Sequence, residues 1–406
     1  MLNAKKLLVV GGQWPLETFI ARRLEGLAKR GFEVTVATNR SAGVKRQPDL
    51  PGVRWKPLPV WTGSKLGIAW DLFRMLAVGF VGAPVRTWRV LRMPVPPKMT
   101  ALSNAHMLLP LLDERPSLLH FEWNTAAVWY LPLADLLGCP MIVSCRGSQV
   151  NIAPHNPGRR EETSAMPATF EKAAAIHCVS KAIGREVVSM GADPAKMHVI
   201  TPAVDPEVFK PATQRPAHRD FRIMMTGSVI WSKGYDYALE ALWELRKRGV
   251  DASITIVGSV DKSNRQRLLY AIDDLDLREN VHVKGTLSPA AVVKELQESD
   301  VLLLASLSEG ISNAVLEAMS CAVPVVTTAC PGMEEAVTEG VEGYLVPVRD
   351  PLAMANALER LAGDAELRQR MGLAGRERIL RDFQISRQID RWVSLYSALG
   401  SPEAAC

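Results

Sequence analysis

Two glutamates, Glu309 and Glu317, stand eight positions apart and offer two carboxylates to one ligand. They belong to the stretch SEGISNAVLEA (308–318), which directly follows an apolar run of strand length. Glu309 lies in the expected loop, and Glu317 lies about one and a half turns into the expected helix. Carboxylates accept hydrogen bonds from hydroxyl groups, so the pair can contact different parts of a sugar-bearing ligand.

The turn between that strand and that helix has the residue types of an anion site. Gly310 permits a tight turn, and Ser312 or Asn313 can cap the helix. A helix N-terminus presents backbone N–H groups without intrahelical partners, and the helix dipole favours negative charge there. We therefore expect Gly310, Ser312 and Asn313 to line a site for a diphosphate.

A lysine after another expected strand can supply a cation to the same diphosphate. The stretch TGSVIWSKGYDYALEAL (226–242) places Gly227 at the end of a strand and Lys233 six residues later. An ammonium beside the phosphates stabilises the charge that develops as a nucleotide leaves. The alternative is an ordinary surface lysine.

A third pattern lies near the N-terminus, where Gly11 and Gly12 follow the first expected strand. This stretch lacks the GxGxxG spacing of a dinucleotide-binding fold. Asn39 and Arg40 stand where such a fold has an acidic residue at the end of the second strand. The pattern therefore argues against NAD.

Together these stretches resemble the retaining glycosyltransferases of family four, in the GT-B superfamily. Glu309 and Glu317 form the E-x7-E pattern of that family, inside the longer string EGxSxxxLEAMxxxxPVV. The resemblance implies that Glu309, Gly310, Ile311 and Ser312 face the sugar and the diphosphate. It implies that Glu317 holds the ribose hydroxyls.

The resemblance also assigns Gly227, Ser228 and Lys233 to the donor site, with Lys233 against the phosphates. The family usually has an Arg soon after the first Gly, and Ser228 stands at that position here. The departure puts a clamp of two cations in doubt. Arg222 or another basic residue would have to supply the second charge.

Two further departures fall in the strings LLHFEWN and SCRGSQV. His120 matches the first His of the family's H-x-H, while Glu122 stands in place of the second. Arg146 stands before Gly147, where many relatives have His. Glu122 and Arg146 can form an ion pair, or Glu122 can bind acceptor hydroxyls or act as a base on the acceptor. A purely structural role is the third alternative.

Apolar runs of strand length alternate with helical patterns along the chain. Strands are expected at 7–12, 33–38, 117–123, 140–145, 175–180, 222–227, 253–258, 281–285, 301–306 and 324–328. The alternation predicts an α/β protein with parallel, doubly wound sheets. A length of 406 residues favours two domains over one.

The GT-B resemblance implies two Rossmann-like domains that face a central cleft. We expect an acceptor-binding domain at 1–205 and a nucleotide-sugar donor domain at 206–382, with a proline-rich linker at 201–220. A C-terminal helix at about 383–400 would cross back to the first domain.

The charge is unevenly placed, with a net +5 overall. Residues 1–205 hold 25 Lys and Arg against 15 Asp and Glu, whereas residues 206–406 hold 23 against 28. A basic first half favours an anionic partner such as lipid headgroups, although a solvated basic surface is an equal alternative. The chain has no dense basic tract or recognised nucleic-acid module, so we expect no nucleic-acid partner.

The stretch 63–99 mixes Trp and Phe with Arg and Lys. This composition predicts either an interfacial helix pair on a membrane or a structural cover packed on the sheet. Six cysteines without a CxxC pair predict reduced thiols. Without a signal peptide or an apolar run of 18 residues, we expect a cytoplasmic protein that is peripheral at the inner face of the membrane.

The resemblance implies a metal-independent, retaining transferase without a cofactor. It would move a hexose-type sugar from a uridine or guanosine diphosphate sugar to a glycan or lipid-diphosphate-linked acceptor, in surface polysaccharide or glycolipid synthesis. The catalytic residues would be Glu309, Lys233 and Glu122. The acceptor side would be bordered by Gly11, Gly12, Arg146 and Gly147. Two alternatives stay open: a GT-B sugar-nucleotide epimerase or hydrolase, and an inactive relative that serves as a binding or scaffold subunit.

Overall fold

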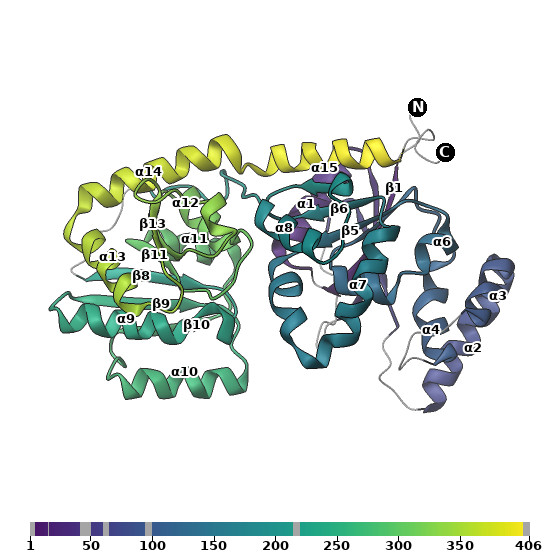
Figure 1. Ribbon diagram of the computed structural model, residues 1–406, viewed down its shortest axis with the longest axis horizontal. Coiled ribbons are helices and arrows are strands. Elements are labelled where there is room, and N and C mark those ends of the chain that lie inside the picture. Colours follow the sequence, from purple (N-terminus) through teal and green to yellow (C-terminus); the bar gives the residue numbers. More distant parts are fainter. Residues whose placement is uncertain are drawn as a thin grey trace. The chain divides into compact units, whose positions relative to one another are not determined.

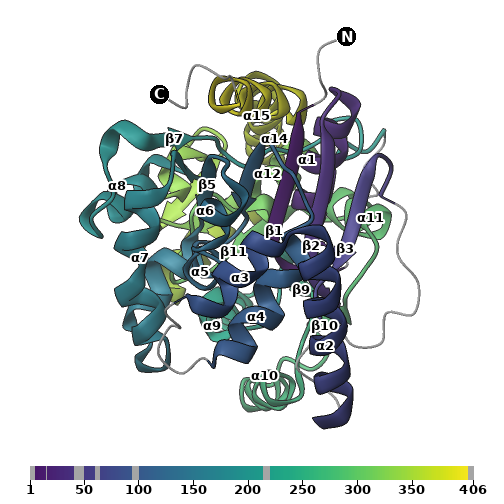
Figure 2. The same cartoon turned by 90° about the vertical axis from the view of Figure 1, so that its right-hand side faces the viewer.

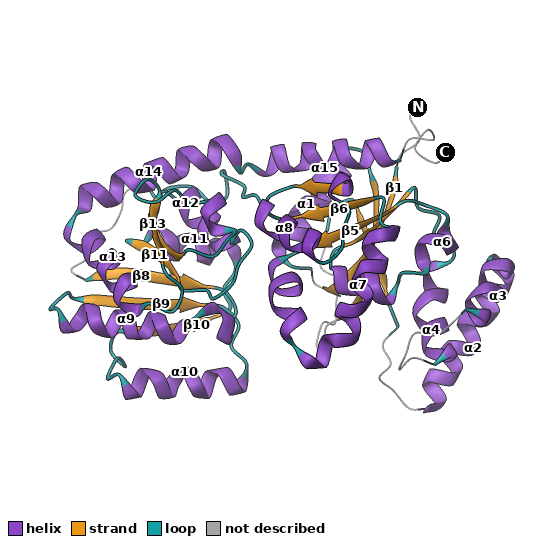
Figure 3. Cartoon of the chain, viewed as in Figure 1, coloured by secondary structure: helices purple, strands orange, loops and turns teal. Residues whose placement is uncertain are grey.

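The computed structural model of the chain describes residues 5–14, 16–40, 50–59, 65–93, 100–213 and 220–400. Parts of the expected membrane-facing stretch (63–64 and 94–99), part of the expected linker (214–219), the first four residues and Cys406 lie outside the described residues. The chain divides into two compact units, each with alternating strands and helices (Figures 1 and 3). Unit 1 comprises residues 1–179, 183–200 and 389–406, and unit 2 comprises residues 180–182 and 201–388.

Unit 1 contains a parallel sheet with the strand order β3-β2-β1-β4-β5-β6-β7. Its strands are β1 (Lys6–Trp14), β2 (Glu33–Arg40), β3 (Val53–Pro57), β4 (Leu118–Phe121), β5 (Met141–Cys145), β6 (Ala175–Cys178) and β7 (Met197–Val199). The order reverses between β1 and β4. In open α/β sheets such a switch point, at the carboxyl ends of the strands, is where ligands bind.

Helices cover both faces of this sheet. They are α1 (Thr18–Lys29), α2 (Lys65–Gly82), α3 (Pro84–Arg92), α4 (Ala101–Leu108), α5 (Asn124–Trp129), α6 (Leu133–Leu137), α7 (Arg160–Lys172), α8 (Lys181–Ser189) and α15 (Ile385–Leu399). Leu8 and Val10 of β1 point into the core cluster on the face of α4 to α7. His120 of β4 points to the other face, where Trp392 of α15 lies against it. The alternation follows from the two-residue period of a strand.

Helices α2, α3 and α4 pack against one another at one side of unit 1, as Figure 2 shows. Leu72 of α2 and Val90 of α3 are buried and belong to the main core of the unit. This helix group therefore covers part of the unit with one face while its other face stays open to solvent.

Unit 2 contains a second parallel sheet with the order β10-β9-β8-β11-β12-β13. Its strands are β8 (Phe221–Thr226), β9 (Ala252–Val257), β10 (Val281–Gly285), β11 (Val301–Leu304), β12 (Val325–Thr328) and β13 (Gly343–Val346). Here the switch point lies between β8 and β11. The loops that carry Lys233 and Glu309 follow these two strands.

The helices of unit 2 are α9 (Tyr235–Lys247), α10 (Lys262–Asp274), α11 (Pro289–Gln297), α12 (Asn313–Ser320), α13 (Pro351–Gly363) and α14 (Ala365–Asp382). Ile223 and Met225 of β8 face the core formed with α9, α10 and α13. Met224, between them, faces the core formed with α11, α12 and α14. Both faces of the sheet are thus buried, which explains the continuous apolar strands of this half.

The expected α/β fold class, with two parallel, doubly wound sheets, is confirmed. Every expected strand is present, but β3, β7 and β13 were not predicted. All three are short strands at the edges of their sheets, and polar residues interrupt β3 and β7. The main segment of unit 2 begins at Thr201, inside the proline-rich stretch, and residues 389–400 pack with unit 1.

Candidate active site

The structure brings Lys233 and Glu309 together although 76 residues separate them in the chain. The Nζ of Lys233 donates to Oε1 of Glu309, and the Oγ of Ser306 donates to the same oxygen over 2.8 Å. The two charged side chains are 25% and 15% exposed. A cation and a carboxylate are therefore held side by side at the carboxyl edge of the sheet, with one part of each open to a ligand.

Gly234 positions the preceding Lys233 beside Glu309. Lys233 ends a 3-10 turn, η6 (Trp231–Lys233), and Gly234 follows with a φ of 65°. A Cβ on Gly234 would lie 2.0 Å from the carbonyl oxygen of Ala305, directly after β11. The N–H of Leu307 also donates to the carbonyl of Ser232 over 2.8 Å. Only glycine allows this close approach of the two loops, so the Lys-Gly pair acts as one structural element.

The start of α12 offers donors to an anion. Ser312 occupies the N-cap position as expected, but its side chain accepts no capping hydrogen bond. Among the described residues, the backbone N–H groups of Gly310, Ile311 and Ser312 have no acceptor. Buried N–H groups without partners are uncommon and costly, so this loop is suited to receive phosphate oxygens.

The loop after β12 supports the Gly310 turn from behind. A Cβ on Gly332 would lie 1.9 Å from the carbonyl oxygen of Gly310. The hydroxyl of Thr328 donates to the carbonyl of Ser306 over 2.6 Å, and the thiol of Cys330 donates to the same carbonyl over 3.2 Å. Burial raises the pKa of the Cys330 thiol, which keeps it neutral. No local sequence pattern predicted these supporting residues.

Gly227 and Ser228 lie in a tightly packed turn after β8. Gly227 has a φ of 135°, and its carbonyl accepts from the hydroxyl of Tyr235 over 2.9 Å. A Cβ on Gly258 would come within 1.9 Å of that carbonyl oxygen. The Oγ of Ser259 donates to the Oγ of Ser228 over 2.9 Å. The hydroxyl of Ser228 thus stands where the family usually has a guanidinium.

Arg222 does not compensate for Ser228. It lies near the amino end of β8, and its Nε donates to Asp220 over 3.2 Å. Gly227 follows the carboxyl end of the strand, about 16 Å away at the rise of a β-strand. The expectation that Arg222 supplies the second cation is therefore wrong.

Glu317 lies on α12 and is half-buried, together with Asn313 at the first position of that helix. The contact of Glu317 with a ribose stays a prediction. Within the described ranges, no group of three or more His, Cys, Asp or Glu side chains is placed to hold a metal ion. Independence of metal also stays a prediction.

In unit 1 the expected ion pair between Glu122 and Arg146 is confirmed. Oε2 of Glu122 accepts from Nη2 of Arg146 over 3.0 Å, and the guanidinium of Arg23 donates to Oε1. The Glu122 side chain has no exposed surface. A carboxylate held by two guanidinium groups and closed to solvent is poorly suited to act as a base on an acceptor, so the geometry favours the ion-pair alternative.

Aromatic rings surround the two arginines. The guanidinium of Arg146 lies 4.7 Å from the ring of Phe19 and 5.3 Å from that of Trp123. Arg23 lies 4.6 Å from the ring of Trp392. Burial lowers the pKa of each guanidinium to about 10, so both stay charged at neutral pH. The two guanidinium groups share the carboxylate of Glu122, and the charge of Glu17 also acts on Arg146.

Gly11 and Gly12 form an irregularity at the carboxyl end of β1. Their φ values are 112° and 86°, and the pairing of β1 with β2 shifts between Val10 and Gln13. A side chain at either glycine would be strained. Gly147 instead has helical backbone angles that any residue adopts. These residues lie where the acceptor side was expected, and that assignment stays a prediction.

A buried chain of hydrogen bonds joins three strands to α15. The Nε2 of His177 must donate to the carbonyl of Ile200, which can only accept, over 2.9 Å. In a neutral ring the Nδ1 of His177 then accepts from Ser144, and Ser144 accepts from Nε2 of His120. The hydroxyl of Tyr396 consequently donates to Nδ1 of His120 over 2.7 Å. His120 is therefore a structural residue in a network of fixed direction.

Comparison with known families covers both units. Residues 16–203 match the family described as glycosyl transferase 4-like domain, and residues 209–378 match glycosyl transferases group 1. The second match spans all six strands of the sheet in unit 2 and includes both predicted donor loops, whereas the first match begins after β1.

Two curated relatives are each 30% identical to this chain. One is a D-inositol 3-phosphate glycosyltransferase of Paenarthrobacter aurescens, matched over 64% of this chain and 68% of the relative. The other is the amylovoran biosynthesis glycosyltransferase AmsK of Erwinia amylovora, matched over 51% and 52%. The chain thus matches about two thirds of the first relative and about half of the second.

Solved structures show the same architecture. HepE of Anabaena, in complex with UDP and glucose, matches with a TM-score of 0.75 and 14% identity, over 97% of this chain and all of that one. A sucrose-phosphate synthase of Thermosynechococcus elongatus matches with a TM-score of 0.75 and 16% identity, over 97% and 99%. At these identities the likeness shows the fold. The chain belongs to the group 1 glycosyltransferases, the family four transferases of the GT-B fold.

Proposed function

We propose that this protein is a retaining glycosyltransferase that moves a hexose-type sugar from a uridine or guanosine diphosphate sugar to a glycan or lipid-diphosphate-linked acceptor. The observation that carries the proposal is the pairing of Lys233 with Glu309 beside the uncapped start of α12. A cation, a carboxylate and backbone donors meet there at the switch point of one sheet. The relative named for amylovoran biosynthesis supports a glycan acceptor, whereas the name of the other relative gives D-inositol 3-phosphate, a small phosphorylated molecule.

The arrangement suggests how transfer proceeds. A donor diphosphate competes with Glu309 for the ammonium of Lys233 and accepts from the N–H groups of Gly310, Ile311 and Ser312. These groups stabilise the negative charge of the leaving diphosphate. Glu309, once released from Lys233, can accept hydrogen bonds from the hydroxyls of the sugar. Glu317 would hold the ribose. Glu122 takes no direct part, because its carboxylate is enclosed by two arginines.

An activity assay tests the proposal. Purified protein is incubated with uridine and guanosine diphosphate sugars, with and without extracted lipid-linked oligosaccharides, and release of the nucleotide is measured. We expect release that depends on the acceptor and falls by about 10²–10³-fold in Glu309→Gln. Release without any acceptor would favour the hydrolase alternative. A rate unchanged in Glu309→Gln would contradict the role of this carboxylate.

We also propose that the protein is cytoplasmic and binds the membrane surface through α2 and α3. No helix among the described residues is long and apolar enough to cross a bilayer. These two helices nevertheless expose at least half of the side chains of Trp70, Phe73, Val78, Val81, Val85 and Trp88. Arginines flank this apolar surface at Arg74, Arg89 and Arg92, and that combination suits an anionic bilayer.

Sedimentation with vesicles tests the membrane proposal. We expect the protein to sediment with phosphatidylglycerol vesicles at low salt, and to be released from them in part at high salt. Replacing Trp70 and Phe73 with serine should abolish sedimentation, while replacing the exposed Tyr270 of unit 2 should not. Equal sedimentation of all three proteins would contradict the role of α2.

A further inference from the structure

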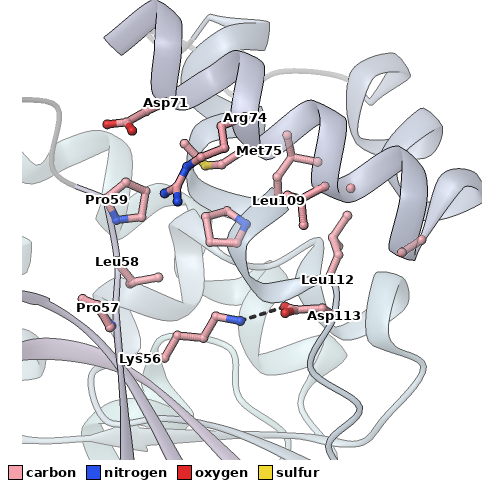
Figure 4. Close-up of a pocket in the computed structure, with 15 residues that line it drawn as sticks. Lys56, Pro57, Leu58, Pro59, Asp71, Arg74, Met75, Leu109, Leu112 and Asp113 are labelled. Atoms are coloured by element: carbon pink, nitrogen blue, oxygen red, sulfur yellow. Dashed lines mark hydrogen bonds and ion pairs between the residues drawn. The ribbon is translucent and has the colours of Figure 1, made fainter. Parts of the chain in front are cut away.

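A large pocket lies beneath α2, on the side of the helix that faces the rest of unit 1. Its volume is about 590 Å³, within the range of small-molecule sites. Figure 4 shows that Leu58, Met75, Leu109 and Leu112 form its walls, from the end of β3, from α2 and from the segment after α4. These walls are apolar, so the pocket fits a hydrocarbon better than a sugar.

A second cavity of about 350 Å³ adjoins the pocket toward α3. It shares Gly82, Ala83, Leu112 and Asp113 with the first, and three of its lining residues are charged: Arg86, Asp113 and Arg115. Arg86 lines the second cavity, and its guanidinium donates to the carbonyl of Leu112 over 3.2 Å. Together the two cavities form a groove that runs from beneath α2 to the start of α3, and an elongated occupant would fit it.

Charged groups mark the polar side of the pocket. Lys56 pairs with Asp113 over 2.7 Å, so its charge is already balanced. Arg74 reaches toward the pocket from α2 near Asp71, as Figure 4 shows, and it has no ion-pair partner among the described residues. The lining also contains the carboxylate of Asp71, so its charges balance, and Arg74 is the group through which a phosphate at the end of a hydrocarbon chain would bind.

Val78 connects the pocket with the outer surface of α2. It lines the pocket, and 62% of its side chain is exposed on the same helix as Trp70 and Phe73. A lipid chain could therefore pass from a membrane at the outer face of α2 into the pocket without crossing a polar barrier.

The pocket also lies at the functional edge of the sheet. Lys56 and Pro57 end β3, and Gly11 and Gly12 lie at the carboxyl end of β1. The strands are parallel, so these ends share one edge, and β2 alone stands between them. Two strand spacings place the pocket about 10 Å along that edge from the expected acceptor side.

We propose that this pocket holds the hydrocarbon chain of the lipid-linked acceptor, with Arg74 beside the phosphate of that lipid. This inference rests on the proposed function and narrows its acceptor to one with a lipid diphosphate. The chain leaves the bilayer along α2, and the groove holds it while the headgroup extends along the sheet edge toward Gly11 and Gly12.

Titration calorimetry with farnesyl diphosphate, a water-soluble lipid diphosphate, tests the proposal on the full chain. Val78→Trp fills the pocket, whereas Val81→Trp adds the same ring to an 89% exposed position of the same helix that does not line it. We expect saturable binding to the unmodified protein, at least tenfold weaker binding to Val78→Trp, and a change below twofold in Val81→Trp. Inorganic diphosphate at the same concentrations should not reproduce the signal.

Two outcomes would overturn the proposal: no saturable binding, or equal weakening of binding by both tryptophans. Binding of UDP and GDP is measured in the same samples as a control for folding. If farnesyl diphosphate binds while neither nucleotide does, the proposed donor chemistry fails and the pocket stands.

Discussion

The ammonium of Lys233 and the carboxylate of Glu309 meet across the switch point of the second sheet, one from the loop after β8 and the other from the loop after β11. Both groups are mostly buried, so their charges interact more strongly than on an open surface. A diphosphate that enters the site replaces the carboxylate of Glu309 as the anionic partner of Lys233. The site is thus arranged to respond to the charge of a ligand.

Gly234→Ala should misplace Lys233. The new Cβ would lie 2.0 Å from the carbonyl of Ala305, and the residue would need a positive φ. Gly249→Ala is the matched control, because it has a φ of 88° with no atom within 4 Å. We expect both variants to lose about 1–2 kcal/mol of stability from backbone strain. Gly234→Ala should lose more because of the overlap with Ala305, and it alone should raise the donor KM more than tenfold. Similar donor KM values in the two variants would contradict the positioning role of Gly234.

Glu122→Gln should destabilise the protein rather than slow its chemistry directly. The change leaves the buried guanidinium groups of Arg23 and Arg146 without their carboxylate, and breaking a buried pair costs about 3–5 kcal/mol. Glu33→Gln is the control, because its pair with Lys6 is more than half exposed and is worth about 0–1 kcal/mol. Urea unfolding gives the comparison. Unchanged stability with a large loss of kcat would instead restore Glu122 as a base.

The sequence predicted both sheets and the residues of the donor loops because these features are local. Apolar strands, glycines and a lysine within a few residues of each strand end can be identified from a short window. Only one of the two ion-pair partners of Glu122 could be predicted. Arg146 was paired with it because both departed from the family pattern, whereas Arg23 looked like an ordinary polar residue of an amphipathic helix.

The contacts that the C-terminal helix makes with the first sheet could not be predicted from local sequence patterns either. Trp392 and Tyr396 meet His120 although more than 270 residues separate them in the chain. Helical periodicity indicates that they lie on one face of α15, but it does not indicate which strand they cover. Ser312 shows the opposite case: its position at the helix start was predicted correctly, while its side-chain hydrogen bond was not.

Tyr396→Phe should weaken the attachment of α15 to unit 1. The hydroxyl is the donor to Nδ1 of His120, and removing it leaves a buried acceptor without a partner. An unsatisfied buried polar atom costs about 1–3 kcal/mol. Tyr270→Phe, at a 71% exposed tyrosine, should change the free energy of unfolding by less than about 0.5 kcal/mol. Equal stability of the two variants would contradict the buried hydrogen bond between Tyr396 and His120.

The free energy of unfolding should decrease as the pH is lowered below about 6.5. Burial holds the pKa of His120 and that of His177 well below the ordinary value of 6.5. Below pH 6.5 the unfolded chain therefore binds more protons than the folded one, and the free energy of unfolding decreases as the pH falls. This contribution is fully present above pH 6.5. Unfolding measured between pH 5 and 8 should show the slope, and His177→Gln should reduce it. A flat profile in the unmodified protein would contradict neutral, buried histidines.

Calorimetric titration of UDP and GDP into the unmodified protein and into Lys233→Ala tests the donor site most directly. Lys262→Ala, at the start of α10 in the same unit, is the control for loss of a lysine. We predict that one of the two nucleotides binds, that Lys233→Ala weakens this binding at least tenfold, and that Lys262→Ala changes it less than twofold. Failure of both nucleotides to bind, or equal affinity for Lys233→Ala and the unmodified protein, would contradict the account.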